Sequence, residues 1–405
     1  MKQIDENLSA TVENYRVWAH IDLDSLMHNY VVSRDYIQAQ SPNTPVISVI
    51  KADAYGHGIA PCARALYTCS CRHFAVANLD EGIAIRAALA DLATEPVEIL
   101  ILGCTNPDLA ALLHKYHMTQ TLFSKEYASQ LHAAAKSAGV VLDVHVKVDT
   151  GMHRIGYPAF TPEQALQTAD EICTLTDTFD AFRIKGLFTH LSDADSGDFC
   201  YEQFKRFCAL KQLLEQRGKC PEVCHACNSP GCMRYPETYL NGVRVGAFLF
   251  GVAPALSQEL DRNPMCNLFP TDQLRPVMRL QTHVIHTHKV AAGEPIGYGA
   301  LCRSQTDRTI ATLSAGYADG WLRAYADTNV TVHTSQGDFI APMVGRICMD
   351  LCMIDVTGLP CQPGDTVTLF GNNVQSLATL AKHANSIAYE IPCLVTARVP
   401  RIYHQ

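Results

Sequence analysis

The chain has 405 residues, more than the ~250–300 residues at which a single hydrophobic core usually stops growing, so we expect two domains. Hydrophobic residues make up 48% and charged residues 18%, with a formal net charge of -8, which is typical of a soluble globular protein; without a basic patch, a nucleic-acid partner is excluded. Residues 1–17 lack the pattern of a secretory signal. No segment reaches the ~18 apolar residues that are needed to span a membrane. The chain has 17 cysteines, an odd number, which fits a protein of the reducing cytoplasm better than a disulfide framework.

Short apolar runs alternate with amphipathic helical stretches from about residue 46 onward. This alternation is typical of βα units that build a parallel sheet. Helical stretches such as 199–216 separate many of the apolar runs. Eight such units predict a TIM-type (β/α)8 barrel over residues 20–262. The strand candidates are residues 46–51, 74–78, 98–102, 119–123, 143–149, 184–190, 223–228 and 243–250.

The texture of the sequence changes after about residue 264. β-Branched runs at 309–313, 330–333 and 366–369 are separated by Gly, Pro, Asn and Asp, and long helical patterns disappear. We therefore predict a mostly β domain over residues 263–405, with residues 1–19 associating with it. No low-complexity linker is present, so the two domains are expected to pack closely.

Polar residues gather where the predicted barrel strands end, the rim that carries the active sites of barrel enzymes. Lys51 closes the first strand, Arg154 follows the fifth, His190 ends the sixth, Asn228 ends the seventh and Arg244 starts the eighth. Apolar surroundings lower the pKa of a lysine and yield the neutral amine that Schiff-base chemistry needs. The competing interpretation of Lys51 alone is a lysine that reaches from a strand end into solvent.

The segment Val-Ile-Lys-Ala-Asp-Ala-Tyr-Gly-His-Gly at 49–58 resembles the cofactor-attachment motif of the alanine racemase family. Further matches follow in family order over nearly the whole chain: Asp-Thr-Gly-Met-His-Arg-Ile-Gly at 149–156, Gly-Leu-Phe-Thr-His at 186–190, Asn-Ser at 228–229, Val-Arg-Val-Gly at 243–246, Gly-Tyr-Ala-Asp-Gly at 316–320 and Val-Gly-Arg-Ile-Cys-Met-Asp at 344–350. The resemblance implies a barrel that binds pyridoxal 5'-phosphate (PLP), followed by a β domain, with residues 18–22 as a strand near the junction.

The resemblance also implies the catalytic residues. Lys51 would hold PLP as a Schiff base and then act as the base on one face of the substrate, with Tyr317 on the opposite face. A racemase needs two such groups, because a single base would usually return the proton to the face that it left. His190 matches the histidine that hydrogen-bonds this tyrosine. Arg244 matches the arginine beside the pyridine nitrogen, which should keep that nitrogen unprotonated and discourage transamination.

Cofactor and substrate contacts carry over in the same way. Tyr55, Ser229 and the backbone around Gly246 and Ala247 would bind the phosphate, and Asn228 joins this cofactor-binding group.

Arg154 would lie near the phenolic oxygen of PLP and the substrate carboxylate, and the backbone amide of Met349 would bind that carboxylate as well. Lys147 occupies the place where some family members carry a carbamylated lysine. In the family, Tyr317 and Met349 reach the cofactor of the other subunit, which implies a homodimer with a shared active site.

The sequence departs from the family at Ala397, where alanine racemases generally have a tyrosine that binds phosphate and walls the substrate pocket. Its loss would leave room for a side chain larger than methyl. We therefore expect serine to be racemised alongside alanine, in the service of D-amino acid biosynthesis. The alternative is a strict alanine racemase in which a neighbouring side chain fills the space.

Three other functions compete with racemisation. Cys220, Cys224 and Cys227 resemble the iron–sulfur signature of radical-SAM enzymes, but they lie at the seventh strand rather than after the first. Related PLP decarboxylases share the two-domain plan, yet the Lys51, Tyr317 and Arg244 motifs favour racemisation. A non-catalytic PLP-binding barrel would not need the second domain.

Overall fold

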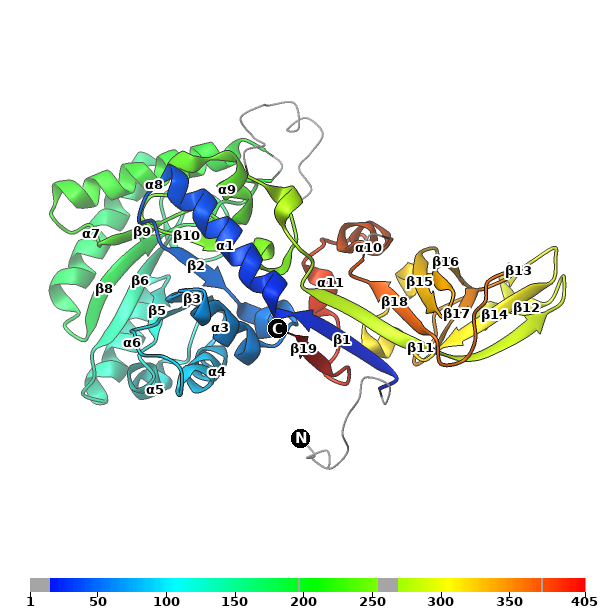
Figure 1. Cartoon of the computed structure of the whole chain (residues 1–405). Coiled ribbons are helices and arrows are strands. Elements are labelled where there is room, and N and C mark those ends of the chain that lie inside the picture. The colour runs from blue at the N-terminus through cyan, green and yellow to red at the C-terminus, as the bar shows by residue number, and fades with distance from the viewer. Residues whose placement is uncertain (1–14, 196, 254–268, 373, 405) are drawn as a thin grey trace. The chain divides into compact units, whose positions relative to one another are not determined.

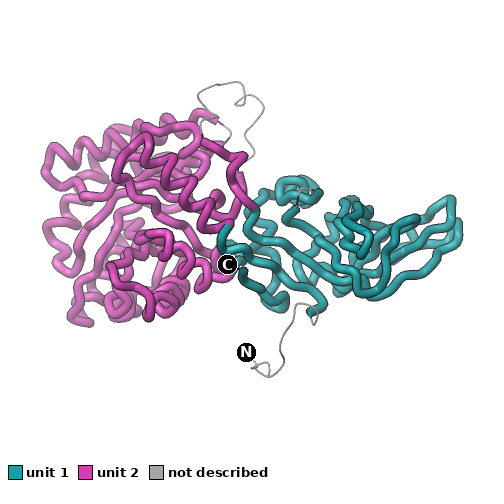
Figure 2. The backbone as a smooth tube through the Cα atoms, viewed as in Figure 1, with its two compact units in different colours: residues 1–24, 55–57, 276–405 teal, residues 25–54, 58–275 magenta. Residues whose placement is uncertain are grey.

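The computed structural model describes residues 15–195, 197–253, 269–372 and 374–404. It contains two compact units (Figure 2). The barrel unit comprises Ser25–Ala54 and Gly58–Arg275, and the β unit comprises Met1–Asp24, Tyr55–His57 and Pro276–Gln405. The boundary predicted between residues 262 and 263 lies outside the described residues, as do residues 1–14. No described helix is both long and apolar enough to cross a membrane.

The barrel unit is a parallel sheet with helices outside it (Figure 1). Its strands follow the order β10-β2-β3-β4-β5-β6-β8-β9, with β7 beside β6, and all these pairs are parallel. The sheet curls into a nearly closed barrel, which confirms the predicted fold class. The strands are β2 (Val46–Val49), β3 (His73–Val76), β4 (Glu98–Ile101), β5 (Thr119–Leu122), β6 (Leu142–Asp149), β7 (Tyr157–Pro158), β8 (Phe182–Phe188), β9 (Val223–His225) and β10 (Val243–Val245).

Capping residues start several helices of the barrel unit soon after a strand ends. Asn78, Ser124 and Asn228 each accept a hydrogen bond from a backbone N–H in the first turn, and Thr161 forms a capping box with Gln164. These caps keep the βα connections short. The helices are α1 (Leu23–Gln40), α3 (Ile59–Thr68), α4 (Leu79–Leu89), α5 (Ala110–Lys115), α6 (Lys125–Ser137), α7 (Pro162–Thr178), α8 (Phe199–Gln216) and α9 (Ser229–Arg234).

Three predicted strands are longer than the observed ones by two residues or more. The strand predicted at 46–51 ends at Val49, and the one predicted at 223–228 ends at His225. The apolar run at 243–250 is a strand only to Val245; Gly246 leaves the extended conformation, and Ala247–Phe250 forms a 3-10 turn. Apolar runs are buried in both conformations, so their periodicity does not distinguish a strand from a buried turn.

The β unit is built on an eight-stranded sheet with the order β14-β17-β16-β15-β18-β11-β1-β19 and an additional β14–β11 pairing. The long strand β11 bonds to β1, β14 and β18, and β19 runs parallel to β1. The predicted runs at 309–313, 330–333 and 366–369 lie in β14, β15 and β18. The strands of this sheet are β1 (Val17–Asp22), β11 (Met278–Val290), β14 (Arg308–Leu313), β15 (Asn329–Thr334), β16 (Gly337–Val344), β17 (Cys352–Asp355), β18 (Thr366–Phe370) and β19 (Arg401–His404), and the small hairpin β12 (Pro295–Ile296) with β13 (Cys302–Arg303) is separate from it.

The β unit contains two short helices besides its strands. They are α10 (Leu377–Ala384) and α11 (Glu390–Cys393). Ser376 caps α10 by accepting the Thr379 N–H, and Asn385 ends the helix in the left-handed conformation. Ser376 and Asn385 are ordinary helix-boundary residues. The helix between them is only about two turns long, so its hydrophobic periodicity is too short to predict a helix.

Candidate active site

The chain makes a left-handed turn directly after β2, beginning at Lys51. The four residues from Ala52 to Tyr55 have φ between 52° and 55°, although none of them is glycine. Each such residue costs about 1–2 kcal/mol relative to the right-handed conformation. The turn is closed by the Ala54 N–H, which donates to Ile50 O at 3.0 Å, and continues into Gly56 and Gly58, which also have positive φ. The surrounding structure must therefore hold this segment in place.

Glu81 supplies much of that support from the first turn of α4. One carboxylate oxygen accepts the Ala52 N–H at 2.7 Å, and the other accepts the Ala77 N–H at 2.8 Å. The carboxylate thus joins the chain after β2 to the chain after β3. On the far side of the turn, Asp53 accepts the Ile59 N–H at 2.8 Å. Lys51 is fixed to the barrel rim through these bonds to backbone.

Four basic side chains at this rim lie near enough to His190 to lower its pKa. Lys147 and Arg244 are only 4% and 3% exposed, and they are joined by Lys51 and Arg154. Burial, and then Arg244 and Arg154, lowers the pKa of Lys147 to about 7. Burial, followed by these four cations, holds the pKa of His190 well below its usual range. So much positive charge in a desolvated place favours an anionic ligand.

The loop that carries Arg154 is shaped by Asp149, at the end of β6. Its carboxylate accepts the backbone N–H groups of Gly151 and His153 at 2.9 and 3.1 Å. The Thr150 hydroxyl meets that of Thr189 at 2.8 Å, which ties the loop to the neighbouring strand end. The exposed Arg154 side chain therefore rests on an ordered loop.

The buried Arg244 guanidinium determines the proton positions on three histidines. It donates to Nδ1 of His225 and, at 3.2 Å, to Nδ1 of His190, and also to the carbonyls of Thr189 and Ala226. A guanidinium only donates, so both Nδ1 atoms accept and both rings carry their proton on Nε2.

The Nε2–H of His225 then donates to Nδ1 of His145 at 3.1 Å. Burial lowers the pKa of His145 to about 4 and that of His225 well below its usual range, so both rings are neutral at pH 7. The same tautomer leaves the Nε2–H of His190 as a donor.

Three of the predicted cofactor-binding residues, Asn228, Ser229 and Gly246, meet at the start of α9. The Ser229 hydroxyl oxygen accepts the Gly246 N–H at 3.0 Å, so its own proton remains available to donate. Asn228 accepts the Gly231 N–H at 3.0 Å and donates to Leu191 O at 3.2 Å. Asn228 therefore orders this turn from within.

Tyr55–His57 belong to the β unit, whereas Lys51 belongs to the barrel unit. Burial raises the pKa of the Tyr55 hydroxyl, and Cys393 and Tyr389 add to the effect. Gly56, at φ 81°, lies so close to Pro392 O that a Cβ would come within 2.3 Å of it. Only glycine fits there.

Tyr317 and Met349 lie on two hydrogen-bonded loops of the β unit. Their side chains are 39% and 54% exposed. The Tyr317 N–H donates to Cys348 O and the Ala318 N–H donates to Met349 O, both at 3.0 Å. The exposed Ala397 lies beside Thr396, whose hydroxyl donates to Ala318 O at 2.8 Å. The structure thus brings these three predicted residues onto one set of hydrogen-bonded loops of the β unit.

Comparison with known proteins agrees with both units. The alanine racemase N-terminal domain matches residues 21–254, and the alanine racemase C-terminal domain matches residues 277–403. The chain belongs to the alanine racemase family. An alanine racemase of Desulfovibrio desulfuricans is 40% identical over 390 residues, covering 96% of this chain and 98% of the relative. One of Clostridium novyi is 36% identical over 394 residues, covering 96% and 95%.

Solved structures give the same result for the fold. An alanine racemase from Clostridium difficile 630 has a TM-score of 0.84 at 32% identity and covers 96% of each chain. The enzyme from Streptomyces coelicolor A3(2) has a TM-score of 0.83 at 30% identity and covers 97% of this chain and 99% of its own. The family is one of isomerases.

The iron–sulfur alternative finds no support in the geometry. The sulfur atoms of Cys220 and Cys224 are 3.8 Å apart, and those of Cys227 and Cys232 are also 3.8 Å apart, as two separate pairs. Within the described residues, no group of three or more His, Cys, Asp or Glu side chains could hold a metal ion.

Sequence reasoning missed several residues of the site. His145 and His225 were not assigned roles, although the alternation of β6 places His145 on the same face as Lys147, a usable signal. Asp319 stood inside a recognised motif without a role. Glu81 and Arg16 gave no sequence signal, because their contacts join segments distant in the chain.

Proposed function

We propose that this chain is a PLP-dependent racemase that interconverts the L and D enantiomers of alanine. The observation that carries the proposal is the cationic barrel rim, where Lys51, Lys147, Arg154 and Arg244 lie near a neutral His190. Within the alanine racemase family, this rim is suited to a cofactor that combines an aldehyde, which a lysine binds, with a phosphate dianion.

The residues of the rim fit PLP in charge and in donor type. Lys51 would bind the aldehyde carbon. The free proton of the Ser229 hydroxyl, the hydroxyl of Tyr55 and the amide of Ala247 are suitable donors to phosphate. The Gly246 N–H instead holds the Ser229 oxygen in place. When bound, PLP draws electrons from the substrate Cα and makes its proton removable.

Arg244 would face the pyridine nitrogen as a cation. Burial lowers its pKa to about 10, which still leaves the guanidinium charged at neutral pH. Because it offers only N–H groups, it favours an unprotonated pyridine nitrogen. His225 and His190 accept two of its donors and so hold its orientation.

Lys51 and Tyr317 would exchange protons with opposite faces of the substrate Cα. Tyrosine has an ordinary pKa near 10 and needs a donor to stabilise its ionised form. His190 can be that donor, since Arg244 occupies its Nδ1 and leaves its Nε2–H free. Arg154 and the Met349 amide would bind the substrate carboxylate.

Tyr317 and Met349 are proposed to serve the barrel of a second copy, as in the family. Their exposure in the single chain supports this, and the neighbouring Leu351 is also 39% exposed. A homodimer would cover this apolar surface while completing two sites by symmetry. The 16 described cysteines are all free thiols, which fits a cytoplasmic location.

Lys147 is the residue that carries a carbamate in some family members. Its pKa of about 7 leaves much of the amine neutral at physiological pH, the form that adds carbon dioxide. A carbamate beside Arg154 would replace a repulsive contact with an attractive one.

Serine is a second candidate substrate, favoured by Ala397. This residue is exposed on a loop held by its neighbours Thr396 and Arg398, where the family generally has tyrosine. Replacing Ala397→Tyr should lower the kcat/KM for serine relative to alanine by about tenfold, within the ~1–3 kcal/mol that a small pocket group supplies. Equal ratios in both enzymes would remove serine from the proposal.

The proposed function is tested with Tyr317→Phe in PLP-loaded enzyme. Racemisation of L-alanine should fall by at least about 100-fold, because general acid–base groups contribute roughly 10²–10⁴-fold. The visible absorbance of bound PLP should persist, because Lys51 is untouched. Undiminished racemisation would contradict the role of Tyr317, and no PLP binding by the wild-type chain would contradict the function itself.

A further inference from the structure

We propose that Asp319 is a positioning residue that fixes the Tyr317 hydroxyl relative to the Met349 amide. The inference rests on the proposed function, in which these two groups handle the substrate proton and carboxylate. Asp319 touches neither substrate nor cofactor; it acts through the turn that carries Tyr317.

The Asp319 carboxylate is buried and fully engaged. The residue is 1% exposed. Arg16 donates through Nη2 to both carboxylate oxygens, at 2.8 and 3.1 Å, and Arg398 Nε donates to Oδ1 at 2.7 Å. The Gly316 N–H adds a bond to Oδ2 at 2.9 Å. A buried carboxylate is retained only with such partners, so this one is held in a single geometry.

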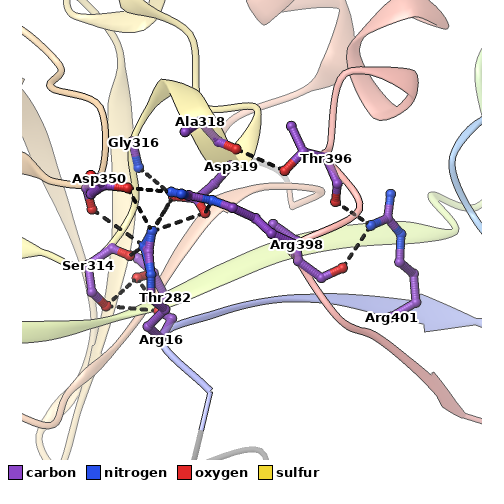
Figure 3. A network of polar contacts seen from close by, with 11 residues as sticks. Arg16, Thr282, Ser314, Gly316, Ala318, Asp319, Asp350, Thr396, Arg398 and Arg401 are labelled. Atoms are coloured by element: carbon purple, nitrogen blue, oxygen red, sulfur yellow. Dashed lines mark hydrogen bonds and ion pairs between the residues drawn. The ribbon is translucent and has the colours of Figure 1, made fainter. Parts of the chain in front are cut away.

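The network extends from this carboxylate to both functional loops (Figure 3). Asp319 ends the 3-10 turn that starts at Tyr317, and its bond to Gly316 closes that turn. Arg398 also donates to the Asp350 carboxylate at 2.7 Å, next to Met349. One arginine therefore links the tyrosine turn to the loop with the carboxylate-binding amide.

Close packing leaves the two loops little freedom to shift. A Cβ on Gly316 would come within 2.3 Å of Met349 O. A Cβ on Gly320, at φ 101°, would come within 2.6 Å of Leu394 O. The backbone of the tyrosine turn is thus set against fixed neighbours on both sides.

The two arginines come from opposite ends of the chain. Arg16 precedes β1, and its carbonyl accepts the hydroxyls of Thr282 and Ser314, both at 2.8 Å. Arg398 follows α11 and lies one residue after Ala397. A buried ion pair is weak support for stability but can specify one geometry. We therefore assign this network to the placement of Tyr317.

The test uses PLP-loaded Asp319→Asn, with Asp355→Asn as a matched control. Asp355 is a largely buried carboxylate of the same unit that pairs with Arg308 at 2.8 Å outside this network. Asp319→Asn should lower kcat by about 10–100-fold with little change in KM, because a misplacement near 1 Å can cost roughly 10²-fold. Asp355→Asn should keep the wild-type kcat.

A kinetic isotope effect separates positioning from mere loss of folding. With Cα-deuterated alanine, slowing the tyrosine-side transfer raises the isotope effect on kcat/KM for the enantiomer whose proton faces Tyr317 and lowers it for the other enantiomer. A partly unfolded enzyme changes neither. Opposite shifts support the inference, and a lowered kcat with unchanged isotope effects overturns it, as does a wild-type kcat.

Amide hydrogen exchange gives a readout independent of turnover. Asp319→Asn should speed exchange in residues 316–320 and 348–350, whereas Asp355→Asn should not. Unchanged exchange overturns the inference. If Asp319→Asn does not fold, Arg398→Gln is tested in the same way, since it removes one partner of the carboxylate. A fully active Tyr317→Phe enzyme would instead mark failure of the proposed function.

Discussion

The turns that carry Lys51 and Tyr317 are held in opposite ways. The turn after Lys51 is strained, with four left-handed residues tied down by backbone bonds to Glu81. The turn at Tyr317 has ordinary backbone angles and is held by an ion-paired carboxylate. In the proposed mechanism, the lysine needs a desolvated and rigid place to stay reactive. The tyrosine would need a fixed backbone and a hydroxyl that can meet groups from outside its own unit.

Their electrostatic surroundings differ as well. Burial is the chief cause that lowers the pKa values of the buried bases at the barrel rim, three histidines and Lys147. The Tyr317 turn instead lies beside charges that are paired. The comparison predicts that pH and backbone changes affect stability and activity mainly through the barrel rim. Loss of ion pairs should affect them mainly through the Tyr317 turn.

Acid should destabilise the barrel unit most. His145, His190 and His225 stay neutral when folded, but in the unfolded chain they take up protons near pH 6.5. The unfolded state then binds more protons, so stability falls as pH drops below 6.5, until each folded pKa is reached, about 4 for His145. Between pH 7 and 5.5 we expect a loss of roughly 4 kcal/mol from three such groups.

Urea unfolding at both pH values measures this loss. Helix circular dichroism reports mainly the barrel, whereas both tryptophans, Trp18 and Trp321, lie in the β unit. His145→Gln can still accept the His225 N–H, and it should reduce the acid-induced loss by about a third. An equal loss in wild type and variant would contradict the neutral histidine chain.

Glu81→Ala should disturb the lysine turn. It removes the acceptor of two backbone N–H groups, those of Ala52 and Ala77, and should lower the free energy of unfolding by about 1–3 kcal/mol and kcat by roughly tenfold. Glu81→Gln keeps one good acceptor, so its free energy of unfolding and its kcat should lie between those of the wild type and those of Glu81→Ala. A wild-type kcat in Glu81→Ala would mean that Lys51 does not depend on this support.

Glycine should have opposite effects at two alanines. Ala52 is exposed and has a left-handed backbone conformation. Ala52→Gly should raise the free energy of unfolding by up to about 1 kcal/mol, because glycine relieves the strain. Ala133 is exposed within α6, and Ala133→Gly should lower the free energy of unfolding by about 1 kcal/mol. Thermal unfolding of both variants checks the signs. Equal destabilisation would show that the turn stores no strain.

The barrel and its rim were predictable because parallel strands are apolar runs that end in polar residues. The positions of Lys51, His190 and Asn228 followed from that pattern, whereas Arg244 lies inside a strand and was found through its motif. The left-handed turn could not be predicted in the same way, because Ala-Asp-Ala-Tyr contains no glycine, the residue that usually indicates a positive φ. Its conformation depends on Glu81, which is about 30 residues away.

The β unit was predictable in class but not in its contacts. Its strands appeared as β-branched runs, yet the bonds from Arg16 and Arg398 to Asp319 join positions that only the folded sheet brings together. Ala397 shows the reverse case. Sequence alone marked it, because its neighbours match the family and it does not.

The central claim is that Lys51 of one copy and Tyr317 of another form one site. Mixing two inactive variants tests this claim most directly. Lys51→Ala and Tyr317→Phe are each expected to be inactive. After subunit exchange, half of the dimers should be mixed and hold one intact site each, restoring roughly a quarter of the wild-type racemase activity. A mixture that stays inactive, although mixed dimers form, would contradict a site shared between two copies.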